Sequence, residues 1–137
     1  MRREFKRRIL SGRGDNRMLI IDGFMGKSRK LVDILIEKGT STSNTIILDS
    51  VGILGLDEYG ISYSLPLEET GEDELIDFFD HMFFLNKNIK YVVLEFNTQR
   101  RNIPLFVQLE KKYRKEFILT VQCPAEESQD GIKVYEI

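Results

Sequence analysis

The chain has 137 residues, of which 42% are hydrophobic and 31% charged, a composition typical of one globular domain large enough to bury a core. No apolar run approaches the roughly 20 residues that a membrane-spanning helix needs. The basic N-terminus is not followed by the apolar stretch of a secretory signal. The single cysteine, Cys123, cannot form an internal disulfide. These features disfavour a membrane or secreted protein, and we expect a cytoplasmic protein without membrane contact.

The net charge of −2 is unevenly distributed along the chain. Residues 1–17 hold seven basic and two acidic residues, a balance of +5, and the total of −2 therefore leaves −7 for the other 120 residues. Between Lys38 and Lys87 there are ten acidic residues and no Lys or Arg. This asymmetry favours a homo-oligomer or an acidic partner protein, although a merely solvated terminus remains an alternative. Nucleic acid is a further candidate partner, which would be bound through Arg2, Arg3, Lys6, Arg7 and Arg8.

Hydrophobic spacing divides the chain into a basic N-terminal arm at 1–16 and a single α/β domain at 17–137. In chain order, the patterns predict a strand at 17–22, a helix at 27–38, strands at 45–49 and 59–65, a helix from Thr70 or Gly71 to Phe83, a strand at 91–96, a helix from Asn102 to Phe117, and strands at 118–121 and 132–137.

Strands that alternate with helices of this length are typical of right-handed βαβ units. We therefore expect a three-layer sandwich with a mostly parallel sheet of five to six strands. The strand at 59–65 alternates between a more apolar and a more polar face, which places it near an edge. No helix separates the last two strands, so the final strand is expected to be antiparallel.

A glycine-rich segment joins the first predicted strand to the first helix: Asp22-Gly-Phe-Met-Gly-Lys-Ser28. Glycines let backbone N–H groups approach a phosphate, a following Lys supplies charge, and Ser at a helix N-terminus can hold Mg²⁺. The full phosphate-loop pattern is G-x-x-x-x-G-K-[ST]. When Gly26-Lys27-Ser28 is aligned with its end, Ile21 takes the place of the first glycine, and the nearest glycine, Gly23, lies two positions after that place. The chain thus carries an incomplete phosphate loop.

A second short motif, Tyr91-Val-Val-Leu-Glu95, is an apolar strand that ends in an acid. With the glycine segment and the order of strands and helices, it resembles the core of P-loop NTPases, and is more similar to the RecA-like and AAA-type branch than to small kinases. The resemblance implies an ATP-binding site with Mg²⁺, in which Glu95 binds the metal or polarises water. It assigns nucleotide binding to Gly23, Gly26, Lys27 and Ser28, and the metal to Ser28 and Glu95. Because the loop is incomplete, we expect a nucleotide or phosphate group to be bound weakly or only within an oligomer or larger complex, with low ATPase activity as the enzymatic possibility.

The polar run from Asn97 to Arg101 follows the acid-ending strand. Thr98 or Gln99 could sense a terminal phosphate or orient a water there. Arg100, and Arg101 beside it, could act as arginine fingers across a subunit interface. The alternative is a polar turn with two solvated arginines.

Two other functional classes remain open. One is a non-catalytic interaction protein that keeps this fold and binds a protein or nucleic acid through its basic arm. The other is a metal-dependent enzyme that uses Asp22, Asp49 and Glu95, three acids at the ends of predicted strands, as oxygen ligands. Of the remaining features, the single histidine, His81, is expected to be structural, and Phe84 either packs under a loop or belongs to a contact surface.

Overall fold

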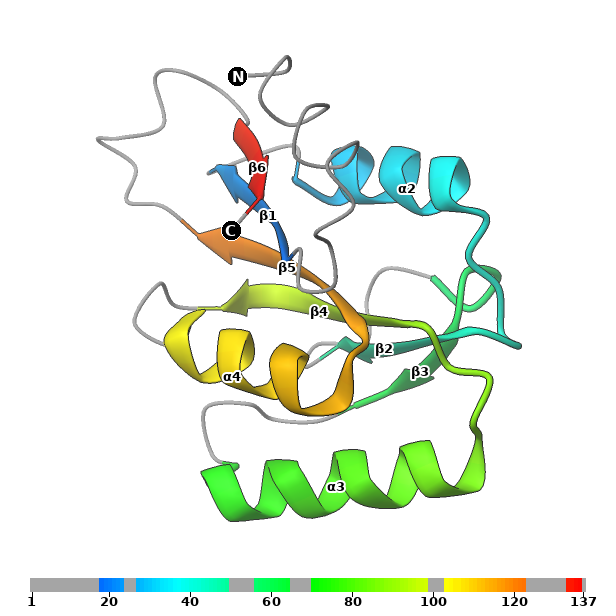
Figure 1. The fold of residues 1–137 in the computed structure, drawn as a ribbon. Helices are drawn as coiled ribbons and strands as arrows, with labels where there is room; N and C mark the ends of the chain where they lie inside the picture. The colour runs from blue at the N-terminus through cyan, green and yellow to red at the C-terminus, as the bar shows by residue number, and fades with distance from the viewer. Residues whose placement is uncertain are drawn as a thin grey trace.

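The computed structural model describes residues 18–23, 27–49, 56–64, 70–98, 103–122 and 133–136. The predicted basic arm lies outside these residues. Helices and strands mostly alternate along the described parts, except that β3 follows β2 and β6 follows β5 directly in this order (Figure 1). Their bounds are β1 (Leu19–Gly23), α2 (Lys27–Lys38), β2 (Thr45–Asp49), β3 (Ile61–Tyr63), α3 (Glu72–Leu85), β4 (Tyr91–Thr98), α4 (Ile103–Tyr113), β5 (Glu116–Gln122) and β6 (Lys133–Glu136).

The strands form one sheet in the order β3-β2-β4-β5-β1-β6. All neighbouring pairs are parallel except β1 and β6, which are antiparallel. The predicted mostly parallel sheet and its antiparallel last strand are both confirmed. The alternating strand β3 lies at the edge of the sheet, as its pattern predicts.

Helices cover both faces of the sheet and give three layers (Figure 1). On one face, α2 buries Leu31 and Leu35 against the sheet. On the other face, α3 and α4 bury Phe79, Phe106 and Leu109. Right-handed crossovers explain this division. The connection through α2 runs across the sheet from β1 to β2, whereas those through α3 and α4 return in the opposite direction, so the two sets fall on opposite faces.

The parallel strands define two edges of the sheet. Their last residues meet at one edge, here called the carboxyl edge, where the chain passes from β1 into α2 and from β3 towards α3. Their first residues meet at the opposite edge, the amino edge. Ligands of open α/β sheets bind outside the carboxyl ends of the strands.

Several predicted boundaries are wrong. The strand expected at 59–65 is limited to Ile61–Tyr63, and the helix expected to end at Phe83 continues to Leu85. The helix expected to reach Phe117 ends at Tyr113, after which Arg114 adopts a left-handed conformation with φ of 57°. Phe117 is therefore a fully buried residue of β5 rather than the last apolar residue of a helix. The strand expected to end at Phe96 continues to Thr98. The pairing of β4 with β5 is irregular after Leu94.

Candidate functional site

The glycine-rich segment lies at the carboxyl edge. β1 pairs with β5 as far as Gly23, which is opposite Gln122, so Gly23 belongs to the strand and not to the turn. α2 begins at Lys27, as the sequence predicts. The three residues 24–26, which include the predicted ligand Gly26, lie outside the described part of the chain. The site therefore consists of the end of β1, the three residues that connect it to α2, and the first turn of α2.

Positive charge is concentrated at the start of α2. Its first four residues include Lys27, Arg29 and Lys30, and its first turn holds no acid. A helix N-terminus is itself the positive end of the helix dipole, so cations are unfavourable there and anions favourable. α3 follows the usual rule, with three acids in its first turn. The start of α2 is thus suited to an anion that its own sequence does not supply.

Lys27 differs from its two basic neighbours in burial. Its side chain is only 7% exposed, whereas Arg29 and Lys30 are exposed. Lysine is almost never fully buried unless its charge is compensated. Asp22, at the end of β1, is also buried. The side chains of both residues take part in interactions in the structure. Buried ionisable side chains of both kinds, one acidic and one basic, therefore lie on either side of residues 24–26, and Lys27 is not a solvated lysine.

The predicted catalytic acid occupies a specific place in the sheet. Glu95 pairs with Asp49, the last residue of β2. Regular pairing between β4 and β5 stops one residue earlier, at Leu94, and resumes where Thr98 meets Val121. The step of four residues from Leu94 to Thr98 in β4 thus matches a step of only two residues from Leu119 to Val121 in β5. The extra residues make this stretch of β4 a bulge. Bulges are over-represented beside active sites, where they redirect side chains.

The end of β4 lies level with the end of β1 across the intervening strand. Thr98 is opposite Val121 of β5, and Val121 is opposite Asp22 of β1. Two strand spacings of about 4.8 Å separate β4 from β1, or about 10 Å. This register brings the backbone of Thr98, a predicted phosphate sensor, to the level of the glycine turn. Gln99, Arg100 and Arg101 lie outside the described residues.

The spacing between strands also tests the metal site predicted from Asp22, Asp49 and Glu95. Asp49 and Glu95 are paired positions, but Asp22 lies about 10 Å from Glu95 across β5. Within the described part of the chain, no group of three His, Cys, Asp or Glu residues could hold a metal ion. The side chains of Ser28, Asp49 and Glu95 are not among those described, so the pair Asp49 and Glu95 stays a candidate for two ligands.

A buried carboxyl group that the sequence patterns above do not indicate lies at the amino edge. Glu110 of α4 is 1% exposed and accepts a hydrogen bond of 2.8 Å from the backbone N–H of Phe117. The backbone of Met18 also hydrogen-bonds to it. Burial raises the pKa of Glu110 to about 7. Its spacing could have revealed it, since Glu110 follows the buried Phe106 by four positions and so lies on the inward face of α4.

No family model, curated protein or solved structure matches this chain. Among the described residues, no helix is long and apolar enough to cross a membrane.

Proposed function

We propose that this chain binds a nucleotide or another phosphate group at the carboxyl edge, with Gly23, Gly26, Lys27 and Ser28 as the binding residues. The observation that carries the proposal is the first turn of α2, where a buried lysine and two exposed basic residues accumulate at the positive end of a helix. A bound phosphate would offset both the helix dipole and these charges. Because only three residues separate the end of β1 from the start of α2, binding is weak or needs an oligomer or larger complex.

The arrangement of the strands supports the same proposal. β1, which leads into the glycine turn, and β4, which carries Glu95, are separated by one strand, β5. Both strands end at the carboxyl edge, which is where open α/β sheets bind ligands. A site of this kind would be an ATPase of low activity if Glu95 activates a water, and Arg100 would contribute from a neighbouring subunit.

A magnesium ion fits the residues assigned to it. A hydroxyl and carboxylates are ligands that Mg²⁺ accepts, together with water and phosphate oxygens. Ser28 would supply the hydroxyl from the first turn of α2, and Glu95 the carboxylate from β4. The ion would offset phosphate charge. Asp49, the paired neighbour of Glu95, adds a second acid at this position in the sheet.

A second candidate function is a non-catalytic interaction protein with a decayed phosphate loop. The replacement of a loop glycine by Ile21, which is fully buried in β1, favours this candidate because it leaves fewer free N–H groups around a phosphate. The two candidates differ in whether Mg·ATP binds at all.

Calorimetric titration of the full chain with Mg·ATP tests the proposed function. Lys27→Met keeps most of the buried stem but removes the charge, and should weaken binding by about 2 kcal/mol, roughly 30-fold. Lys30→Met is the matched control, because Lys30 lies in the same turn but is exposed, and it should change the affinity only a few-fold. Equal affinities of the parent and Lys27→Met, or no binding by the parent, would contradict the proposal.

A further inference from the structure

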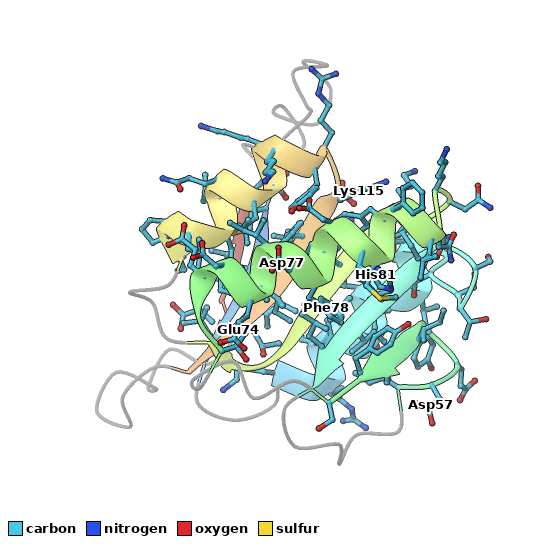
Figure 2. The ribbon with its side chains drawn as sticks, turned by 90° about the horizontal axis from the view of Figure 1, so that it is seen from below. Asp57, Glu74, Asp77, Phe78, His81 and Lys115 are labelled. Atoms are coloured by element: carbon cyan, nitrogen blue, oxygen red, sulfur yellow. The ribbon has the colours of Figure 1, made fainter. Side chains whose placement is uncertain are left out.

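The outer face of α3 carries a stripe of negative charge. Five of its side chains are exposed acids, and the helix contains no Lys or Arg. Glu74 and Asp77 lie along this helix, followed by His81 (Figure 2). The exposed acids are Glu72, Asp73, Glu74, Asp77 and Asp80.

The described residues leave this charge largely uncompensated. The ion pair found among them, Lys38 with Glu116, involves no residue of α3. Asp80 accepts a hydrogen bond of 2.7 Å from the hydroxyl of Tyr113, which is neutral. Lys115 lies near α3, but its Nζ donates to the carbonyl of Ile89 at 2.7 Å and lies 5.1 Å from the centre of the Phe83 ring. Within the described part of the chain, the acids of α3 are therefore not neutralised.

The same stripe ends in exposed apolar side chains. Phe84 is 76% exposed and Leu85 is 64% exposed. Phe84 follows Asp77 by seven positions and therefore lies on the same side of the helix. The exposure of Phe84 excludes packing under a described loop and favours a contact surface. A partner for this face needs several positive charges and a few apolar side chains.

Residues 1–17 of the chain have this composition. They carry a net charge of +5, and their apolar residues are Phe5, Ile9 and Leu10 besides the initial Met. Complementary charge of this kind accelerates association and fixes the relative orientation of two partners.

The two ends of α3 lie near opposite edges of the sheet. Residues 1–17 join the sheet at Met18, at the amino edge. α3 follows β3 and precedes β4, and these strands run in the same direction, so its first three acids lie near the carboxyl edge, away from that attachment point, and Phe84 and Leu85 lie near the amino edge. In a head-to-tail arrangement, the amino edge of one copy faces the carboxyl edge of the next.

We propose that the acidic face of α3, with Phe84 and Leu85 at its end, is the docking surface for residues 1–17 of a second copy of this chain. The contact joins two different surfaces, so it can be repeated and builds rings or filaments. It does not depend on nucleotide binding.

Sedimentation analysis of the full chain at low and high salt tests this docking surface. The parent should associate at low salt and dissociate as salt screens the charges. Asp73→Lys with Asp77→Lys should leave a monomer. The matched control is Asp33→Lys with Glu37→Lys, an exposed pair with the same spacing on α2, and it should associate like the parent. Loss of association in both double variants, or in neither, would overturn the proposal.

A charge swap controls for misfolding and identifies the occupant. Arg7→Glu with Arg8→Glu should abolish association, and combining it with the α3 double variant should restore it. Mixing the arm variant with the α3 variant should give heterodimers only, because each has one functional surface. A mixture that stays monomeric would overturn the proposal, because an intact arm and an intact α3 face would then be present on different copies and still fail to bind. Salt-sensitive binding of duplex RNA by residues 1–17 without self-association would also overturn it.

Discussion

Glu110 ties three elements together at the amino edge. Its carboxyl group is buried on α4, and the backbone groups of Phe117 and Met18 hydrogen-bond to it at the starts of β5 and β1. Burial is the largest cause that raises the pKa of Glu110, from 4.5 to about 7, and the nearby acids Glu116 and Glu136 raise it further. The two hydrogen bonds lower this pKa, but by less. Between these two values the folded protein holds a proton that the unfolded chain releases, so the free energy of unfolding falls as the pH rises.

This linkage predicts a measurable pH dependence of stability. The contribution of the protonated group should be fully present below about pH 4.5 and lost by about pH 7, a change of up to about 3 kcal/mol. Glu110→Gln cannot ionise and should flatten the decline in urea unfolding free energy measured from pH 5 to pH 8. Glu37→Gln, at an exposed position of α2, should keep the decline of the parent. An unchanged slope in Glu110→Gln would contradict the assignment of this effect to Glu110.

Glu95 leads to a different prediction, since its proposed role is chemical. Glu95→Gln should retain Mg·ATP binding within a few-fold, because the amide keeps the size of the side chain, while any phosphate release is lost. The measurement is phosphate release over time beside a binding titration of the same samples. Hydrolysis by Glu95→Gln at the rate of the parent would remove Glu95 from the mechanism. A parent that binds but never hydrolyses would favour the non-catalytic candidate.

Among the elements, α3 is held in place by aromatic side chains on its inner face. Phe79 is fully buried, and the centre of its ring lies 5.6 Å from that of Phe83 and 5.6 Å from that of Phe117. The hydroxyl of Tyr113 adds hydrogen bonds from α4 to Asp80 and to the carbonyl of Ile76. The stability of this helix therefore depends on its inner face, while its acidic outer face is available for contacts.

Two phenylalanines of α3 allow a matched test of this division. Phe79→Ala should destabilise the fold by about 3–5 kcal/mol, because it leaves a cavity in the core. Phe84→Ala should change the stability by no more than about 0.5 kcal/mol, because that ring is 76% exposed. Urea unfolding at low protein concentration and high salt measures both without self-association. Comparable losses in the two variants would mean that Phe84 is structural.

The elements also show what the sequence could predict. The apolar stripe of α3 and the buried strand β2 were predicted from their spacing alone, since hydrophobic periodicity reports burial directly. The end of α4 could not be predicted in this way, because Phe117 continues the helical spacing of apolar residues four positions after Tyr113. Arg114 has a positive φ although it is neither Gly nor Asn, so α4 ends where the sequence carries neither of the residues that usually take this conformation after a helix. The bulge in β4 was missed for a similar reason, since it is a property of the pairing with β5.

On the scale of the whole molecule, the sheet separates two kinds of surface. The carboxyl edge holds the basic start of α2 and the acid of β4, while the amino edge holds buried Glu110 and the attachment point of residues 1–17. The alternation of strands and helices predicted this layered fold, and the Gly-Lys-Ser segment predicted where the turn lies. The burial of Lys27 could not be predicted, because helix-start lysines are usually solvated.

We propose above all that phosphate binds between the end of β1 and the start of α2. The most direct measurement is a titration of the ¹⁵N-labelled full chain with Mg·ATP, followed through its backbone amide resonances. The largest shifts should occur at Gly23, Gly26, Lys27 and Ser28, since these amides would face the phosphate. The amide resonances of α3, on the opposite face of the sheet, should not shift. Shifts confined to residues 1–17, or no shifts at millimolar nucleotide, would contradict this proposal.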